Sequence, residues 1–352
     1  ADPTSRSPLS LASGGDAGLL PTDDAGDVGA LKVPKRVAPP ARLPRRAKPD
    51  GRLPPVEPEE VSPFTSVRKG QFDKACRPFY PVGFNGFELV MLAATNQRAL
   101  VDDAFEQARA LGLNTARTWA HSITPQLPFQ GSPGKYDAEG VEALDYVLDS
   151  AARHGISMIL SFADNWKYYN GVDQYVDWST TAPARGPNNK PPFQDKTGDP
   201  NPGDYGTGPG AEEVKRYEVA RHALFYTDPD ARRFYKDHVS FLLGRTNSIN
   251  GRKYGEDPTI LAWNLINEPR CESWLAANSD CDRDLQGWLK DMARHVRSLD
   301  PNHLITIGSE GFYGASTPAL KKYNPAEWAS DLGQDFVANT DIPEIDFATV
   351  HA

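Results

Sequence analysis

The sequence predicts an α/β protein whose parallel strands close into a (β/α)8 barrel. Apolar strand segments alternate with helical segments along the chain from Val61 onward. The strand segments are almost continuously apolar, as parallel strands buried on both faces must be. Polar and aromatic residues gather just after the strand ends, and in a barrel those ends share the one face where active sites lie.

An open, doubly wound sheet is the other fold that this alternation fits. Such sheets often bind nucleotides through a glycine-rich turn that follows the first strand. No G-x-G-x-x-G follows the first expected strand, and residues 131–136 do not fit a phosphate loop. The sequence therefore favours the closed barrel.

The expected elements follow one another in a regular order. A small hairpin over residues 64–80 precedes the first barrel strand at 81–87. Further strands are expected at 114–120, 157–162, 260–266, 304–308 and 347–350, and helices at 97–111, 139–154, 228–243 and 284–299. This gives about six of the eight βα units of a complete barrel.

Two of these helices carry a specific local signal. In the first, Leu100, Ala104, Ala108 and Leu111 share one face, which we expect to be buried. The helix from residue 228 begins with Asp228-Pro229, a capping side chain followed by proline at the first helical position.

Composition separates the first 60 residues from the rest. Residues 1–60 contain 11 of the 31 prolines and no aromatic residue, so we expect them to be a disordered segment. Residues 61–352 form the expected barrel domain. Within it, residues 180–210 are a long connection rich in proline, glycine, asparagine and aspartate, of the kind that is functional or disordered.

Charge and cysteine content bound the function. The net charge of −9 gives no reason to expect nucleic acid as a partner, and no run of 18 apolar residues predicts a membrane span. Cys271 and Cys281 enclose a short polar loop and could form a disulfide, although all three cysteines could also be reduced. A disulfide would suit an extracellular, secreted protein.

The strongest local signal is the strand segment Trp263-Asn264-Leu265-Ile266-Asn267-Glu268-Pro269-Arg270. Because a residue before proline avoids the helical region, we expect Glu268 to be held extended at the strand tip. Aromatic neighbours should raise the pKa of its carboxyl group by burying it. Such a group can protonate a glycosidic oxygen, while Asn267 can hydrogen-bond the sugar 2-hydroxyl.

Six segments together resemble glycoside hydrolase family 5. They are Pro81-Val82-Gly83-Phe84-Asn85, Ala116-Arg117-Thr118-Trp119-Ala120, Asn165-Trp166 with Gly171 and Tyr175-Val176-Asp177-Trp178, Asn267-Glu268-Pro269-Arg270-Cys271, Glu310-Gly311-Phe312-Tyr313-Gly314 and Thr349-Val350-His351. The likeness covers about residues 61–352 and is greatest to the endo-β-1,4-mannanases of plants and fungi. In this clan, clan A, the acid/base lies on strand four and the nucleophile on strand seven.

The resemblance implies a role for each site residue. Glu268 would be the acid/base, and Asn267 and Arg117 would organise the −1 sugar site. Arg270 would reach toward the leaving group, and Trp119, Glu310 and His351 would contact sugar or line the cleft. The residues themselves suggest that Arg117 needs a carboxylate partner at its strand end. Trp166 could stack on a sugar or pack into the barrel rim.

The chain departs from the family at its nucleophile. A retaining glycosidase needs two carboxylates about 5–5.5 Å apart. Glu310 follows the fifth expected strand and is therefore read as a substrate-site residue. We expect the nucleophile and the last two βα units to lie beyond Ala352, so that residues 61–352 alone would be inactive.

The expected activity is retaining endo-hydrolysis of β-1,4-mannan, glucomannan or galactomannan by a monomer. A β-1,4-glucanase of the same family and a non-catalytic carbohydrate-binding protein are the alternatives. Scattered histidines and the lack of an H-E-x-x-H motif give no indication of a metal. Proton transfer and a covalent glycosyl intermediate need no cofactor.

Overall fold

The structure, a computed structural model, describes residues 62–124, 127–183 and 211–351. The segment 1–60 and most of the connection 180–210 lie outside the described residues, so the expectations for them stay untested. The strands are β1 (Thr65–Arg68), β2 (Gln71–Lys74), β3 (Arg77–Pro78), β4 (Gly83–Asn85), β5 (Thr115–Trp119), β6 (Ser122–Thr124), β7 (Leu127–Pro128), β8 (Gln130–Ser132), β9 (Lys135–Tyr136), β10 (Ser157–Ser161), β11 (Ile260–Asn264) and β12 (Leu304–Thr306). The α-helices are α1 (Leu89–Ala94), α2 (Arg98–Ala110), α3 (Ala138–His154), α4 (Asp173–Trp178), α5 (Ala211–Ala223), α6 (Pro229–Gly244), α7 (Cys281–Leu299) and α8 (Phe336–Thr340).

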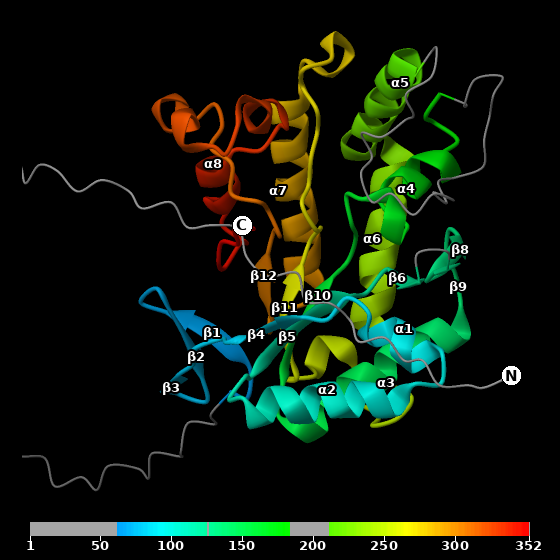
Figure 1. Ribbon diagram of the computed structural model, residues 1–352, viewed down its shortest axis with the longest axis vertical. Coiled ribbons are helices and arrows are strands. Elements are labelled where there is room, and N and C mark those ends of the chain that lie inside the picture. The colour runs from blue at the N-terminus through cyan, green and yellow to red at the C-terminus, as the bar shows by residue number, and fades with distance from the viewer. Residues whose placement is uncertain (1–61, 125–126, 184–210, 352) are drawn as a thin grey trace, which may run out of the picture. The chain divides into compact units, whose positions relative to one another are not determined.

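The central sheet has five parallel strands in the order β4-β5-β10-β11-β12 (Figure 1). Each strand therefore pairs with the next strand of the sheet along the chain. A doubly wound sheet reverses its strand order, whereas a (β/α)8 barrel does not. The order is that of the barrel, which confirms the predicted fold class.

Helices follow the strands and cover the sheet, with α2 packed beside α3 and α6 beside α7 (Figure 1). The start of α6 is as predicted, because Asp228 Oδ1 accepts a hydrogen bond from the backbone N–H of Ala231 at 2.9 Å. The face of α7 that packs inward carries buried residues that include Leu285, Trp288, Leu289, Met292 and Val296.

The N-terminal strands β1, β2 and β3 form a small antiparallel sheet near the amino ends of the barrel strands. Phe72 and Phe79 pack against buried Leu261 and Leu304 of the barrel strands. Lys74 Nζ donates a hydrogen bond to the hydroxyl of Ser157, the first residue of β10, at 2.9 Å. The opposite, carboxyl ends of the strands carry the residues described in the next subsection.

Two details of the expected elements are wrong. The segment 347–350 forms no strand, so five strands stand where six were expected. Backbone hydrogen bonds flank it only at its two edges, from Asp346 N–H to Ile305 O at 2.9 Å and from His351 N–H to Glu310 O at 3.3 Å. Between them the contacts come from side chains, because the Thr306 hydroxyl donates to Phe347 O at 2.9 Å and Ser309 Oγ donates to Thr349 O at 3.2 Å. A segment held in this way does not build a regular backbone ladder.

The second wrong detail is the buried face of α2. Leu100 and Leu111 are 48% and 78% exposed, whereas Ala108 is buried as predicted, together with Val101 and Phe105. Both sets of residues fit the helical period, so the period alone does not choose between them. Packing against α1 and α3 selects the second set.

Candidate active site

The candidate site lies where β5, β10, β11 and β12 end. Strand register aligns Trp119 with Ser161, Ser161 with Asn264, and Asn264 with Thr306. Just beyond this row an isolated parallel bridge joins Asp164 to Asn267. The residues that follow the strands are thereby gathered at one edge, as the barrel fold predicts.

Both carboxylate oxygens of Glu268 accept hydrogen bonds from aromatic side chains. Trp166 Nε1 donates to Oε2 at 2.5 Å, and His351 Nδ1 donates to Oε1 at 2.7 Å. The side chain of Glu268 is 23% exposed, so part of it still faces solvent. Trp166 follows β10, Glu268 follows β11 and His351 follows the segment 347–350, and the three side chains meet at this carboxyl group.

The backbone of Glu268 differs from the predicted extended conformation. Its φ is 49°, in the left-handed region that a residue other than glycine rarely adopts. Its N–H donates to Gly308 O, the carbonyl beyond the end of β12, at 2.8 Å. The neighbouring strand end thus holds Glu268 in a strained backbone conformation, which is a feature of functional sites.

The pKa of Glu268 also differs from the expectation. Burial raises the pKa of this carboxyl group, as predicted. The hydrogen bonds from His351 and Trp166 and the charges of His351 and Arg270 outweigh burial, and the pKa of Glu268 lies below its usual value. The aromatic neighbours therefore stabilise the carboxylate because they donate hydrogen bonds to it.

Arg117 and Asn267 lie in one hydrogen-bond network beside Glu268. Arg117 Nη2 donates to Asn267 Oδ1 at 2.8 Å and to Asn264 Oδ1 at 2.7 Å. Asn267 Nδ2 donates to Asp164 Oδ1 at 2.8 Å. Arg117 therefore binds amide oxygens rather than the expected carboxylate. Burial lowers the pKa of Arg117, and the nearby charges of Asp164 and Glu268 offset this effect only in part.

Arg270 and Glu310 form a bidentate ion pair at the edge of the site. Arg270 Nε and Nη2 donate to the two carboxylate oxygens of Glu310 at 2.8 and 2.5 Å. The guanidinium group also lies over the rings of Trp166 and Trp328, with its carbon 4.7 and 5.2 Å from their centroids. Gln334 Nε2 adds a further hydrogen bond to Glu310 at 2.9 Å.

Trp119 is only 7% exposed at the end of β5. Its ring lies 6.3 Å from that of Phe87, and the guanidinium carbon of Arg117 lies 5.2 Å from its centroid. Its indole N–H has no hydrogen-bond partner among the described residues. Contact with sugar stays a prediction for this residue.

A buried hydrogen-bond network that was not predicted connects Asp173, His222 and Asn165 next to the site. His222 of α5 lies with Nε2 3.0 Å from Asn165 Oδ1 and Nδ1 3.1 Å from Asp173 Oδ2. Burial lowers the pKa of His222, but the charge and hydrogen bond of Asp173 outweigh it and raise the pKa. Asn165 Oδ1 also accepts from the N–H of Arg270 at 3.1 Å, so this network positions the segment after Glu268.

Asp164 is a further site residue that was not predicted. It is 1% exposed, and burial raises the pKa of its carboxyl group to about 7. The signal was present in the sequence, because Asp164 directly precedes Asn165-Trp166 after a predicted strand. Its hydrogen-bond partner Asn267 could not be predicted, because it lies 103 residues further along the chain.

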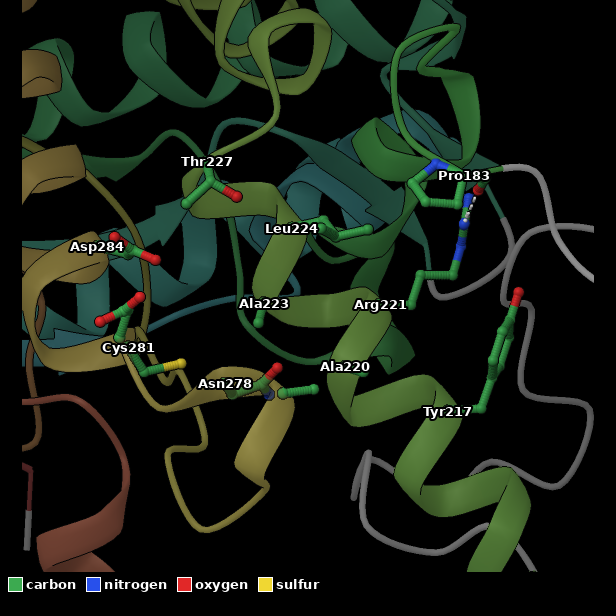
Figure 2. A pocket seen from close by; sticks show the side chains of 12 residues that line it. Pro183, Tyr217, Ala220, Arg221, Ala223, Leu224, Thr227, Asn278, Cys281 and Asp284 are labelled. Atoms are coloured by element: carbon green, nitrogen blue, oxygen red, sulfur yellow. Dashed lines mark hydrogen bonds between the residues drawn. The ribbon is translucent and has the colours of Figure 1, made fainter.

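A separate cavity of about 350 Å³ lies between α5, the 3₁₀ helix Leu224–Tyr226 and the start of α7 (Figure 2). Its lining includes Tyr217, Arg221, Asn278 and Cys281, and neither Trp166 nor His351, the side-chain partners of Glu268, belongs to it. Arg221 is bound to Asp177 and to two backbone carbonyls, and Asn278 Nδ2 donates to two more. These polar groups serve the fold.

Cys281, which lines this cavity, forms the predicted disulfide with Cys271, with Cα atoms 5.3 Å apart, and Cys76 is a free, exposed cysteine. Among the described residues there is no cluster of three side chains that could hold a metal ion. No described helix is long and apolar enough to cross a membrane.

Comparison with known proteins connects this geometry to a family. The family model described as GH family 5 beta-mannosidase-like matches residues 62–337. Mannan endo-1,4-beta-mannosidase 1 of Oryza sativa subsp. japonica is 40% identical over 278 residues, which cover 78% of this chain and 55% of that protein. Mannan endo-1,4-beta-mannosidase 7 of Arabidopsis thaliana is 39% identical over 290 residues, covering 82% and 58%. The chain thus spans about half the length of the curated relatives it matches.

Solved structures of two mannanases also superpose on this chain. The endo-1,4-beta-mannanase from Rhizomucor miehei superposes with a TM-score of 0.61 at 27% identity, covering 82% of this chain and 71% of that one. The endo-beta-1,4-mannanase from Thermotoga petrophila gives a TM-score of 0.57 at 28% identity, covering 78% and 52%.

Proposed function

Since this chain belongs to the GH family 5 beta-mannosidase-like family, we propose that the protein is a retaining endo-hydrolase of β-1,4-mannosidic linkages. Its substrates are mannan, glucomannan or galactomannan. The observation that carries the proposal is the Glu268 carboxyl group, which lies at a strand end beside Asn267 and accepts hydrogen bonds from Trp166 and His351.

Glu268 is the proposed acid/base. In the first step its carboxyl group protonates the glycosidic oxygen while a nucleophilic carboxylate attacks the anomeric carbon and forms a glycosyl-enzyme. In the second step Glu268 takes a proton from the water that hydrolyses this intermediate. Asn267 would hydrogen-bond the sugar 2-hydroxyl, a contact that strengthens in the oxocarbenium-like transition state.

The first step requires a protonated Glu268, yet its neighbours lower the pKa of this group. A second carboxylate about 5–5.5 Å away would raise that pKa by charge repulsion and would also be the nucleophile. Asp164 is buried against Asn267, and Glu310 is bound by Arg270 and Gln334, so neither is suited to this role. We propose that the nucleophile is a further carboxylate of the protein, distinct from these two.

The proposal is tested by replacing Glu268 with Gln in the whole gene product. Release of reducing ends from mannan should fall by at least 10²-fold, because general acid catalysis contributes about 10²–10⁴-fold. Binding of mannohexaose should be retained. The matched control is Glu272→Gln, a nearby carboxylate bound to Trp274, which should leave turnover unchanged. Full activity of the Glu268→Gln protein would remove this residue from the mechanism.

The same assay separates the alternatives. Faster hydrolysis of carboxymethylcellulose than of mannan would assign a β-1,4-glucanase. Binding of both polymers without hydrolysis would indicate a carbohydrate-binding protein.

We further propose that the protein is secreted and monomeric. The disulfide between Cys271 and Cys281 supports export, because disulfides persist in oxidising compartments. Detection in culture medium and the mass in solution test these two points.

A further inference from the structure

Asp164 carries a carboxyl group that the proposed reaction does not use. It is 1% exposed and follows β10, whereas its side-chain partner Asn267 follows β11. Its Oδ1 accepts a hydrogen bond from Asn267 Nδ2 at 2.8 Å, and the backbone N–H of Trp166 also donates to its carboxylate. A buried carboxyl group is costly unless such partners compensate for it.

The opposite side of the Asn267 amide is held by Arg117. Arginine has only donors, so the atom of Asn267 that meets Arg117 Nη2 at 2.8 Å must be the amide oxygen. The nitrogen must then face Asp164, and Asn267 Nδ2 donates to Asp164 Oδ1 at 2.8 Å. Together Arg117 and Asp164 fix which way the amide points.

The backbone on both sides of this contact is fixed as well. Asn267 N–H donates to Ala163 O at 2.9 Å, and Asn165 N–H donates to Asn267 O at 3.0 Å. The ends of β10 and β11 are therefore locked in register around the Asp164–Asn267 pair. Since the backbone is held independently, the side-chain bond to Asp164 acts on the amide alone.

We propose that Asp164 is a positioning residue for hydrolysis: it orients the Asn267 amide so that the second N–H of that nitrogen meets a sugar hydroxyl. This inference rests on the proposed function. Asn267 directly precedes Glu268, so the amide and the acid/base are carried by the same strand end. Loss of Asp164 would leave the amide held only by the hydrogen bond from Arg117 to its oxygen, so that the whole amide plane could tilt.

A double-mutant cycle in the whole protein tests this role. Asp164→Ala and Asn267→Ala should each lower kcat for mannohexaose, by up to about 100-fold, as small misplacements in active sites do. If Asp164 acts through Asn267, the second substitution should add less than about 3-fold to the first. The proposal would be overturned if Asp164→Ala lowered kcat by the same factor in the presence and absence of the Asn267 side chain. It would also be overturned if the kcat of the Asp164→Ala protein stayed within twofold of wild type.

Two further variants keep the result interpretable. Asp164→Asn preserves the shape but can offer its oxygen to only one of the two donors, so its kcat should fall between wild type and Asp164→Ala. It decides the question if the alanine variant does not fold. Asp102→Asn is the matched control, because that carboxylate also accepts side-chain hydrogen bonds, from Tyr146 and Ser150, but lies on α2. Its kcat should match wild type.

Failure of this inference can be told apart from failure of the proposed function. If Glu268→Gln abolishes hydrolysis and Asp164→Ala does not slow it, the function stands and the inference falls. If the wild-type protein hydrolyses no β-1,4-mannan, the same cycle is measured as the affinity for mannohexaose. Additive losses of affinity at the two positions would then overturn the inference.

Discussion

Trp166 donates its indole N–H to the Oε2 atom of Glu268 at 2.5 Å. This hydrogen bond joins the segment after β10 to the segment after β11 and is one of the effects that lower the pKa of Glu268. The bond stabilises the charged form of the proposed acid, so it affects the pH at which the acid can work.

Replacing Trp166 with Phe removes this donor and keeps an aromatic ring. The pKa of Glu268 should rise, because the carboxylate loses a hydrogen bond that favours it. A general acid must be protonated, so the alkaline limb of the pH profile of kcat/KM should move to higher pH. The matched control is Trp274→Phe, since Trp274 donates the same bond to Glu272 at 2.5 Å outside the site. An alkaline limb that stays in place would show that this bond does not tune the acid.

The ion pair between Arg270 and Glu310 leads to a stability prediction. The side chains are only 18% and 8% exposed, so Glu310→Ala leaves a largely buried guanidinium group without its bidentate partner. The free energy of unfolding should fall by about 1–3 kcal/mol. Glu310→Gln keeps one acceptor and should cost less.

Thermal denaturation of the whole protein measures this effect. The control is Asp280→Ala, which breaks an ion pair with Arg283. The side chains of Asp280 and Arg283 are 62% and 71% exposed. Exposed pairs contribute little, so this change should leave Tm unaltered. Equal Tm values for Glu310→Ala and Asp280→Ala would contradict the expectation that the buried ion pair stabilises the protein more than the exposed one.

Much of the fold follows from local patterns in the sequence. The alternation of apolar strands and amphipathic helices, and the Asp228-Pro229 helix start, depend on neighbouring residues and are found as predicted. The position of Glu268 also followed from chain order, because strand ends in a barrel share one face. Local periodicity did not determine the buried side of α2, since two sets of residues fit it equally well.

The details of the site depend on contacts between distant residues. The left-handed backbone of Glu268 is held by the carbonyl of Gly308, and its pKa is lowered by Trp166 and His351. These partners lie 40, 102 and 83 residues away in the chain. Proline at 269 predicted a restricted backbone but not which restricted conformation the neighbouring strand would select.

The disulfide leads to a third prediction. Cys271 and Cys281 are 10 residues apart, and closing a loop of this size stabilises a protein by about 2–3 kcal/mol through the entropy of the unfolded chain. Cys271→Ser with Cys281→Ser should therefore lower Tm, and a reductant should do the same to the wild-type protein. Cys76→Ser provides the control, because that cysteine is exposed and unpaired. Equal Tm values for the two variants would refute the expected contribution.

The fourth prediction concerns how stability varies with pH through Asp164. Burial raises the pKa of this group to about 7 in the folded protein from the usual value of 3.8. The charges nearest to it are Glu268, which raises its pKa further, and Arg117, which lowers it. Between the two pKa values the folded protein keeps a proton that the unfolded chain has lost. Stability contributed by this group therefore falls as the pH rises from about 4 to 7, and then stays constant.

Asp164→Asn removes this titration, so the variant should gain stability relative to wild type as the pH rises from 5 to about 7, with no further gain above that. The substitution also removes a hydrogen bond to the carboxylate. This loss changes the difference in stability between the two proteins by a similar amount at every pH, so the trend with pH remains. Other groups, including His222, are present in both proteins and cancel in the difference. Tm measured for both proteins from pH 5 to 8 checks the trend. A difference in Tm that is constant over this range would mean that Asp164 is already ionised at pH 5, and that Arg117 and Asn267 outweigh its burial.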